Sequence, residues 1–314
     1  MKIILAPMEG VVDYAMRELL TASGHYDLCI TEFVRVVDQV YRPAFFRKIC
    51  PELDPELNQG GTTRAGTPVR VQLLGQHADW MAENAAVAAD LGSCGIDINF
   101  GCPAKTVNRH RGGAILLQEP ETLYKIVKAV RDAVPGDQPV SAKMRLGYAT
   151  ADLALDCAHA IESAGANMIT VHARTKMEGY KPPAHWHIID DMRRHISIPV
   201  TANGDIWSRP DAENCRRVSG CDDIMIGRGA LCLPNLASVI KVNAAPMPWK
   251  EACDILILYA CFSRPSQQRG YLPSRIKQWF SYLKRHYQQA HILFEKIKRL
   301  RQLDDIITLI RQER

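Results

Sequence analysis

The sequence predicts an α/β fold, a (β/α)8 TIM barrel followed by a small all-helical C-terminal domain. Eight short apolar runs alternate with amphipathic helical stretches up to residue 245, and helical stretches without strands follow. Eight β/α units typically occupy about 250 residues, which matches the length of the first part. We therefore expect a catalytic barrel at 1–245 and a helical domain at 246–314.

The eight predicted strands are nearly continuous apolar runs, as is typical of parallel strands that are covered on both faces. They span 3–6, 28–33, 69–73, 96–99, 140–144, 168–172, 200–202 and 223–226. The helices predicted between them span 14–22, 80–91, 120–134, 153–164, 187–195 and 209–219. Several of these helices end at a glycine, the usual C-terminal stop, namely Gly24, Gly92, Gly165 and Gly220.

A doubly wound sheet is the alternative architecture, but it usually has fewer strands and a glycine-rich first turn. The Gly-x-Gly pattern of this chain, at Gly227 and Gly229, follows the eighth predicted strand and lacks the third glycine of the dinucleotide motif. In a barrel the same position suits a phosphate site, which forms after strands seven and eight. Candidate residues for that site are Asn203, Gly204, Asp205, Gly227 and Arg228.

Composition excludes several classes of protein. Of the 314 residues, 47% are hydrophobic and 23% are charged, which is ordinary for a globular chain. No apolar run approaches the ~18 residues of a membrane span, and the apolar N-terminus is too short for a signal peptide. The ten cysteines form no Cys-x-x-Cys pair, which argues against a metal site and against a disulfide framework. We expect no metal, no membrane partner and a reducing cytoplasm.

Charge is distributed unevenly along the chain. Residues 1–245 hold 26 Lys/Arg and 28 Asp/Glu, a net charge of −2, whereas residues 246–314 hold 13 and 6, a net charge of +7. Helices are predicted there at 249–262, 274–286, 289–300 and 304–312, and segment 275–285 interleaves basic and aromatic residues. The asymmetry indicates a polyanionic partner for the helical domain, although a solvated helical surface would give the same count.

Polar side chains recur at the carboxyl ends of the predicted strands, which form the catalytic face of a barrel. They are Met8 and Glu9, the segment from Glu32 to Arg35, Gln72, Asn99 and Cys102, Lys143 and Arg145, and His172 and Arg174. Any one of them alone is more simply a satisfied buried polar residue. Six such groups at the ends of different strands indicate one shared site.

Cys102 and Lys143 carry the strongest chemical signals. Cys102 follows a short strand and lies between Gly101 and Pro103, close to several cations in the sequence, so its thiol is placed for chemistry. The alternative is a small buried hydrophobic residue, the commonest role of a free cysteine. Lys143 lies in an apolar run and therefore needs an anionic partner or a depressed pKa.

Seven segments together make the chain resemble the tRNA-dihydrouridine synthase family over essentially its whole length. They are LAPMEGV at 5–11, VQLLG at 71–75, DINFGCP at 97–103 with Lys105, KMRLG at 143–147, VHART at 171–175, NGDI at 203–206 and IGRGA at 226–230. Segments 31–35 and 275–279 are most similar to the bacterial C subfamily, which reduces the uridine at position 16 of the tRNA D loop.

The resemblance implies a bound FMN on the barrel, NADPH as the reductant and the tRNA D loop as the partner. It implies that Pro7, Met8 and Glu9 line the flavin, that Gln72 and Lys143 contact its pyrimidine side, and that His172 lies at its edge. Asn203, Gly204, Asp205, Gly227 and Arg228 would hold its phosphate. Hydride would pass from flavin N5 to C6 of the uracil, and Cys102 would protonate C5 as a neutral thiol. We expect a monomer.

The resemblance also implies two groups of substrate contacts. Asn99, Arg145 and Arg174 are candidates for the target base and its phosphates, and Arg35, Arg275, Lys277 and Arg299 for the orientation of the tRNA. Three alternatives remain. A flavin-dependent barrel dehydrogenase for a free pyrimidine or another small molecule would not need the basic domain. A Schiff-base aldolase at Lys143 would contain no flavin. A non-catalytic RNA-binding protein would tolerate replacement of Cys102.

Overall fold

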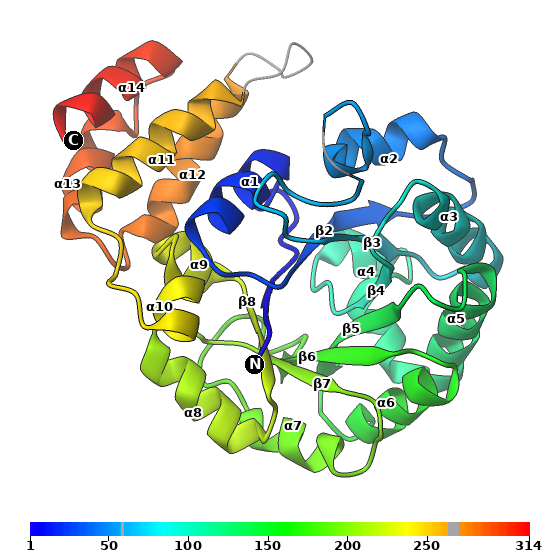
Figure 1. Cartoon of the computed structure of the whole chain (residues 1–314). Helices are drawn as coiled ribbons and strands as arrows, with labels where there is room; N and C mark the ends of the chain where they lie inside the picture. The colour runs from blue at the N-terminus through cyan, green and yellow to red at the C-terminus, as the bar shows by residue number, and fades with distance from the viewer. Residues whose placement is uncertain (58–59, 263–269) are drawn as a thin grey trace.

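The computed structural model describes residues 1–57, 60–262 and 270–314, and its centre is a closed barrel of eight parallel strands (Figure 1). Each strand pairs with the next along the chain, and β1 closes the barrel against β8. The strands are β1 (Ile3–Leu5), β2 (Leu28–Arg35), β3 (Val69–Leu74), β4 (Ile96–Phe100), β5 (Val140–Gly147), β6 (Met168–Thr175), β7 (Val200–Asn203) and β8 (Asp223–Ile226). The predicted fold class is confirmed.

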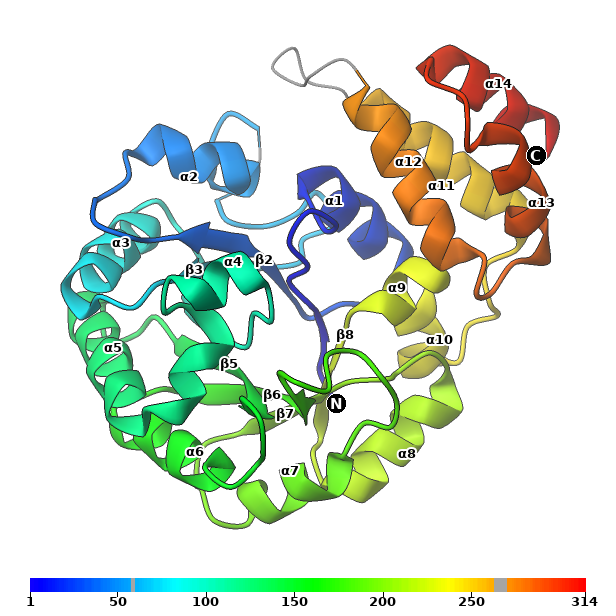
Figure 2. The same ribbon diagram turned by 180° about the vertical axis from the view of Figure 1, so that it is seen from behind.

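Six helices form the outer layer of the barrel, between the strands where the sequence predicts them (Figure 2). They are α1 (Tyr14–Ser23), α3 (Ala78–Asp90), α5 (Pro120–Ala133), α6 (Ala154–Ser163), α7 (Trp186–Arg193) and α8 (Arg209–Ser219). Helix α5 shows the amphipathic pattern of these helices. Its buried face is an i, i+3, i+4, i+7 set: Leu123, Ile126, Val127 and Val130.

Short helices in the loops were not predicted. They are α2 (Pro43–Ile49) and the 3₁₀ turn η1 (Pro51–Leu53) after β2, α4 (Lys105–Arg109) and the 3₁₀ turn η2 (Gly113–Gln118) after β4, and α9 (Arg228–Cys232) and α10 (Leu236–Val242) after β8. Residues of α2, α4 and α9 lie at the carboxyl ends of the strands, where barrel enzymes carry their sites, whereas α10 packs against α8 and its Lys241 pairs with Asp27 just before β2.

Two strands extend three residues further than predicted. β5 continues to Gly147 and β6 to Thr175, because the ladder between them pairs Arg145 with His172 and Gly147 with Thr175. The polar residues in these runs were interpreted as the ends of the strands, whereas they are polar side chains within the strands. Lys143, Arg145 and His172 therefore rest on regular sheet rather than on loops.

Four helices follow the barrel and pack beside α1 and α9 (Figures 1 and 2). They are α11 (Trp249–Cys261), α12 (Tyr271–Leu283), α13 (Gln288–Ile297) and α14 (Leu303–Gln312). Ile276, Trp279, Phe280 and Leu283 of α12 are buried in the core, whereas Tyr282 is only partly buried. Trp279 Nε1 donates to the carbonyl oxygen of Leu231 at 3.1 Å, which ties α12 to α9.

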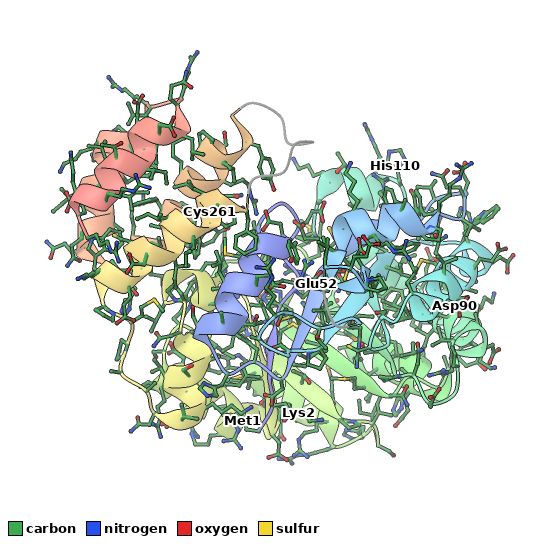
Figure 3. All side chains as sticks on the ribbon, turned by 45° about the horizontal axis from the view of Figure 1, so that its top comes forward. Met1, Lys2, Glu52, Asp90, His110 and Cys261 are labelled. Atoms are coloured by element: carbon green, nitrogen blue, oxygen red, sulfur yellow. The ribbon has the colours of Figure 1, made fainter. Side chains whose placement is uncertain are left out.

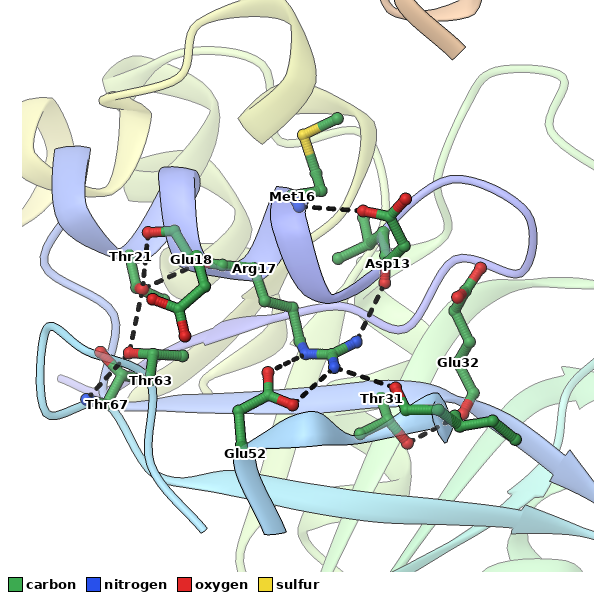
Figure 4. A network of polar contacts seen from close by, with 12 residues as sticks. Asp13, Met16, Arg17, Glu18, Thr21, Thr31, Glu32, Glu52, Thr63 and Thr67 are labelled. Atoms are coloured by element: carbon green, nitrogen blue, oxygen red, sulfur yellow. Dashed lines mark hydrogen bonds and ion pairs between the residues drawn. The ribbon is translucent and has the colours of Figure 1, made fainter. Parts of the chain in front are cut away.

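A buried ion pair joins α1 to the segment that follows β2 (Figure 4). Both nitrogens Nε and Nη2 of Arg17 donate to the carboxylate of Glu52, at 2.7 and 2.8 Å, and both side chains are fully buried. Thr21 adds a hydrogen bond of 3.0 Å to Thr63. Because removal of one partner leaves an unpaired buried charge, this contact fixes the α2 insertion on the barrel.

No helix in the described ranges is both long enough and apolar enough to cross a membrane. Within the same ranges no group of three or more His, Cys, Asp or Glu side chains is arranged to hold a metal ion.

Candidate active site

A cavity of about 900 Å³ opens at the carboxyl ends of the strands and is lined by residues from all eight β/α units. Fifteen of the predicted site residues line it: Pro7, Met8, Glu9, Arg35, Gln72, Asn99, Cys102, Lys143, Arg145, His172, Asn203, Gly204, Asp205, Gly227 and Arg228. Arg174, Arg275, Lys277 and Arg299 lie outside the lining. Local sequence runs that are far apart in the chain therefore meet in one space.

Cys102 lies on a tight turn directly after β4. Asn99 Oδ1 accepts hydrogen bonds from the backbone N–H groups of Gly101 and Cys102, both at 2.9 Å. The carbonyl oxygen of Cys102 accepts from Asn108 Nδ2 at 2.8 Å. A Cβ on Gly113, whose φ is +67°, would lie 2.9 Å from Cys102 Cβ, so the turn requires this glycine. Cys102 is thus held at the cavity wall.

At the thiol end of the cavity the pKa values of two acidic groups are raised. Burial raises the pKa of the Cys102 thiol above its ordinary value, so at neutral pH it is a thiol rather than a thiolate. Burial, with Glu32 nearby, raises the pKa of Glu9 to about 7. The expectation that the Cys102 pKa is not strongly lowered agrees with this environment.

Lys143 and His172 lie on neighbouring strands at the floor of the cavity. Lys143 Nζ donates to Asn203 Oδ1 at 3.3 Å, and burial, assisted by Arg145, lowers the Lys143 pKa to about 8. Burial, together with the positive charges of Arg145 and Lys143, lowers the pKa of His172 well below its ordinary value, so the imidazole is neutral. The depressed lysine pKa is one of the two outcomes that the apolar sequence context predicts.

The opposite end of the cavity is cationic. Asp205, at φ +50°, forms ion pairs with Arg174 and with Arg228, the latter at 3.3 Å. Arg174 is fully buried behind Asp205, and its Nη1 has no hydrogen-bond partner within the described parts of the chain. Arg174 therefore lies behind the cavity wall, and its contact with the substrate stays a prediction.

Two aromatic rings at this end were not identified from the sequence. The guanidinium of Arg228 lies 4.9 Å from the ring centre of Tyr180 and 4.8 Å from that of Trp207. Arg145 covers Tyr180 at 5.2 Å, and Arg285, at the end of α12, covers Trp207 at 3.7 Å. These stacks hold Arg228 between two rings. The available signal was an aromatic residue in each loop after β6 and β7.

Arg145 and Arg275 mainly contact protein groups. Arg145 is buried and donates to the carbonyl oxygens of Gly101, Thr175 and Gly179 at 2.8–3.0 Å. Arg275 donates to the carbonyl oxygen of Val11 and lies 3.5 Å from the carboxylate of Asp13. That carboxylate also accepts from the hydroxyls of Tyr259 and Tyr271, at 2.8 and 2.9 Å, so α11 and α12 grip the loop after β1.

The other two predicted tRNA contacts of the helical part differ in exposure. Lys277 is half-buried and donates to the carbonyl oxygen of Leu300 at 3.0 Å, whereas Arg299 is exposed. Arg35 lies at the rim of the cavity on β2. The proposed contacts of these three residues with tRNA stay predictions.

Comparison with known proteins identifies the family. A family model described as dihydrouridine synthase matches residues 4–312. The tRNA-dihydrouridine(16) synthase of Shewanella oneidensis is 52% identical over 312 residues, which is 99% of this chain and 98% of that protein. The tRNA-dihydrouridine(16) synthase of Haemophilus influenzae is 51% identical over 307 residues, 98% of each chain.

Solved structures show the same fold at low identity. A variant of NCR from Zymomonas mobilis superposes with a TM-score of 0.55 at 14% identity, over 78% of this chain and 88% of that chain. Morphinone reductase in complex with tetrahydroNAD gives 0.53 at 13% identity, with the same coverage. The similarity in sequence over the whole length, not this shared barrel, decides the identity: the chain belongs to the dihydrouridine synthase family.

Proposed function

We propose that the protein reduces uridine 16 in the D loop of tRNA to 5,6-dihydrouridine, with bound FMN and with NADPH as the reductant. Relatives with about half of their residues identical over the full length are named tRNA-dihydrouridine(16) synthases. The observation that carries the proposal is one cavity with a protonated thiol, Cys102, at one end and a cationic site around Arg228 at the other.

The donors around the cavity fit a flavin. Gln72 uses its oxygen for Asn99 and one N–H for Asp97, so its second N–H is a donor for a ligand. With the Lys143 ammonium it would bind the acceptor atoms on the pyrimidine side of FMN. When bound, FMN supplies the hydride that adds to C6 of the uracil, and NADPH restores the reduced cofactor.

The cationic end fits the phosphate of the same cofactor. Arg228 would hold the phosphate, positioned by Asp205, which Arg174 anchors from behind. The donor set thus complements both ends of one FMN.

Cys102 completes the reduction. A hydride at C6 and a proton at C5 convert the C5–C6 double bond of the uracil into a single bond. The neutral thiol of Cys102 gives the C5 proton, and the thiolate that remains recovers a proton from water before the next turnover. Asn99 and Arg35, both on the cavity lining, are available for the base and the tRNA backbone.

The helical segment 246–314 acts in this proposal as the tRNA-binding domain, and the protein works as a cytoplasmic monomer. The net charge of the segment is +7, from 13 Lys/Arg and 6 Asp/Glu. Exposed cations in the turn after α12, in α13 and in the turn that follows it are candidates for phosphates of the tRNA: Arg285, Lys296, Lys298, Arg299 and Arg301. Lys296 and Lys298 also pair with Glu313 and Glu295. All ten cysteines are unpaired, in keeping with a reducing compartment.

The proposal is tested with the purified full-length chain. We expect flavin absorbance and NADPH oxidation that requires unmodified tRNA. Oxidation driven by a free pyrimidine, without tRNA, would support the small-molecule dehydrogenase instead. A colourless protein whose Lys143 is trapped by borohydride in the presence of an aldehyde or ketone would contradict the flavin assignment.

A further inference from the structure

A continuous hydrogen-bonded relay runs from the barrel core to the turn that carries Cys102. Gln72 Nε2 donates to Asp97 Oδ2 at 2.6 Å, and Asn99 Nδ2 donates to Gln72 Oε1 at 2.8 Å. Asn99 Oδ1 accepts from the N–H groups of Gly101 and Cys102. Gln72 and Asp97 are partners in the β3–β4 register, and Asp97 and Asn99 share one face of β4.

The groups at the two ends of the relay require the same orientation of the Gln72 and Asn99 amides. At one end the backbone N–H groups of Gly101 and Cys102 are donors, so Asn99 has to present its oxygen to them. At the other end the Asp97 carboxylate only accepts, so Gln72 has to present its nitrogen. With both amides in these orientations, the Asn99 nitrogen faces the Gln72 oxygen. Every hydrogen bond along the relay then joins a donor to an acceptor in one arrangement.

Asp97 is anchored as an acceptor on its far side. Its Oδ1 accepts from the hydroxyl of Ser141 at 2.5 Å, and that hydroxyl accepts from Arg70 Nη1 at 2.9 Å. Asp97 is fully buried, and Ser141 is 1% exposed. Both carboxylate oxygens of Asp97 are thus occupied by donors, in a place where an unmatched polar atom is costly.

We propose that Asp97 is a positioning residue, whose carboxylate fixes the orientation of the Gln72 and Asn99 side-chain amides and thereby the turn that presents Cys102. The same orientation decides that Gln72 offers the cavity an N–H donor and not an oxygen. Asp97 itself lies outside the cavity lining. The relay stands on hydrogen bonds alone, whereas its value for catalysis rests on the proposed function.

A double-mutant cycle between Asp97 and Asn99 tests the relay. Asn99→Asp places acceptors on both sides of Gln72, and we expect it to lower the Tm by roughly 2–6 °C. Adding Asp97→Asn lets Gln72 reverse, because the new amide donates to its oxygen and its nitrogen donates to position 99. The double variant should therefore recover most of the loss, although Asp97→Asn alone lowers the Tm.

Two controls keep the test decisive. Ser141→Ala removes the other hydrogen bond of Asp97 without changing the direction of the relay, so its effect should add to that of Asn99→Asp. If Asn99→Asp does not fold, Gln72→Glu creates the same conflict with Asp97, and Asp97→Asn should again relieve it. Additive effects of Asp97→Asn with Asn99→Asp or with Gln72→Glu, or an Asp97→Asn variant as stable as wild type, would overturn the proposal.

Thiol labelling reports on the turn itself. Cys261 on α11 (Figure 3) is exposed and serves as a reference within the same molecule for alkylation measured by peptide mass spectrometry. Asp97→Asn should raise the ratio of Cys102 to Cys261 labelling several-fold, and the double variant should restore it. An unchanged ratio in Asp97→Asn would overturn the link to Cys102. Neither readout needs flavin or tRNA, so failure of the proposed function would be seen separately.

Discussion

The two ends of the cavity are built by different means. At the thiol end, neutral amides and backbone groups hold Cys102, and burial raises the pKa values of Cys102 and Glu9. At the cationic end, Asp205 forms ion pairs with two arginines. Aromatic rings stack on Arg228 from two sides. Acidic groups at the thiol end therefore have raised pKa values, whereas the arginines at the cationic end carry positive charge.

This difference indicates that one end of the cavity suits proton donation and the other suits phosphate binding. A group that donates a proton has to hold it before the reaction, and at Cys102 burial outweighs the nearby Arg145 and Arg35, which lower the thiol pKa. A group that holds a phosphate has to be charged at every pH, and arginine meets this need. Lys143 lies between the two, with a pKa of about 8. Each end should therefore fail in its own way when it is altered.

The largest effect is expected at the thiol end. Cys102→Ala removes the acid without touching the cationic end, so the rate of tRNA-dependent NADPH oxidation should fall by about 10²–10⁴-fold. Flavin absorbance per mole of protein should stay at the wild-type level. Cys261→Ala, on an exposed position of α11, is the control and should keep the wild-type rate. A Cys102→Ala variant with more than a tenth of that rate would argue against proton donation at the thiol end.

A substitution at the cationic end should weaken the affinity of the protein for FMN. Arg228→Ala removes a charge-assisted contact worth about 1.5–3 kcal/mol, so the Kd for FMN should rise roughly 10- to 100-fold. Titration of the cofactor-free protein by flavin fluorescence measures it. Arg216→Ala, on the partly exposed surface of α8, is the matched loss of an arginine and should leave the Kd unchanged. Equal effects of both variants would remove the special role of Arg228.

Lys143 should make flavin affinity depend on pH. Its pKa is lowered to about 8, so the charged form is lost as the pH rises through 8 and not through the ordinary value near 10.5. Between pH 7 and pH 9 the FMN Kd of wild type should rise by up to about 10-fold. Lys143→Met should bind weakly at pH 7 and show no further loss at pH 9. The same slope in both proteins would assign the titration to another group.

The smallest effect concerns the rings at the cationic end. Trp207→Ala removes the face that Arg228 and Arg285 share, and an exposed cation–π contact is worth about 0.5–2 kcal/mol. The FMN Kd should rise about 2- to 10-fold, well below the effect of Arg228→Ala. Trp207→Phe, which keeps a ring, should recover part of the loss. A Trp207→Ala variant as weak as Arg228→Ala would mean that the ring, rather than the charge, holds the ligand.

The barrel could be predicted because its elements repeat a local pattern. Every predicted strand and barrel helix has a counterpart in the structure, since buried parallel strands and amphipathic helices leave periods that a short window detects. The limits of β5 and β6 were wrong because Arg145 and His172 interrupt apolar runs without ending the sheet. The short helices α2, α4, α9 and α10 lack such a pattern and depend on the surfaces they cover.

The membership of the cavity lining followed from strand ends, but the partners of each side chain did not. The pairing of Arg174 with Asp205, the stacking of Arg228 on Trp207 and the contact of Arg275 with Asp13 join residues that are far apart or in irregular loops. Arg275 illustrates the consequence: a basic residue in a basic segment predicts a phosphate contact, yet a carboxylate 262 positions away lies beside it. Only the three-dimensional fold decides between these roles.

Mapping dihydrouridine along a tRNA tests the central claim most directly. Purified full-length protein, NADPH and unmodified tRNA are incubated, and each D-loop uridine is examined by mass spectrometry of the digested RNA. We predict reduction at position 16 by the wild-type protein and no detectable reduction by Cys102→Ala at the same enzyme concentration and time. Dihydrouridine at another position, or equal reduction by both proteins, would contradict the account.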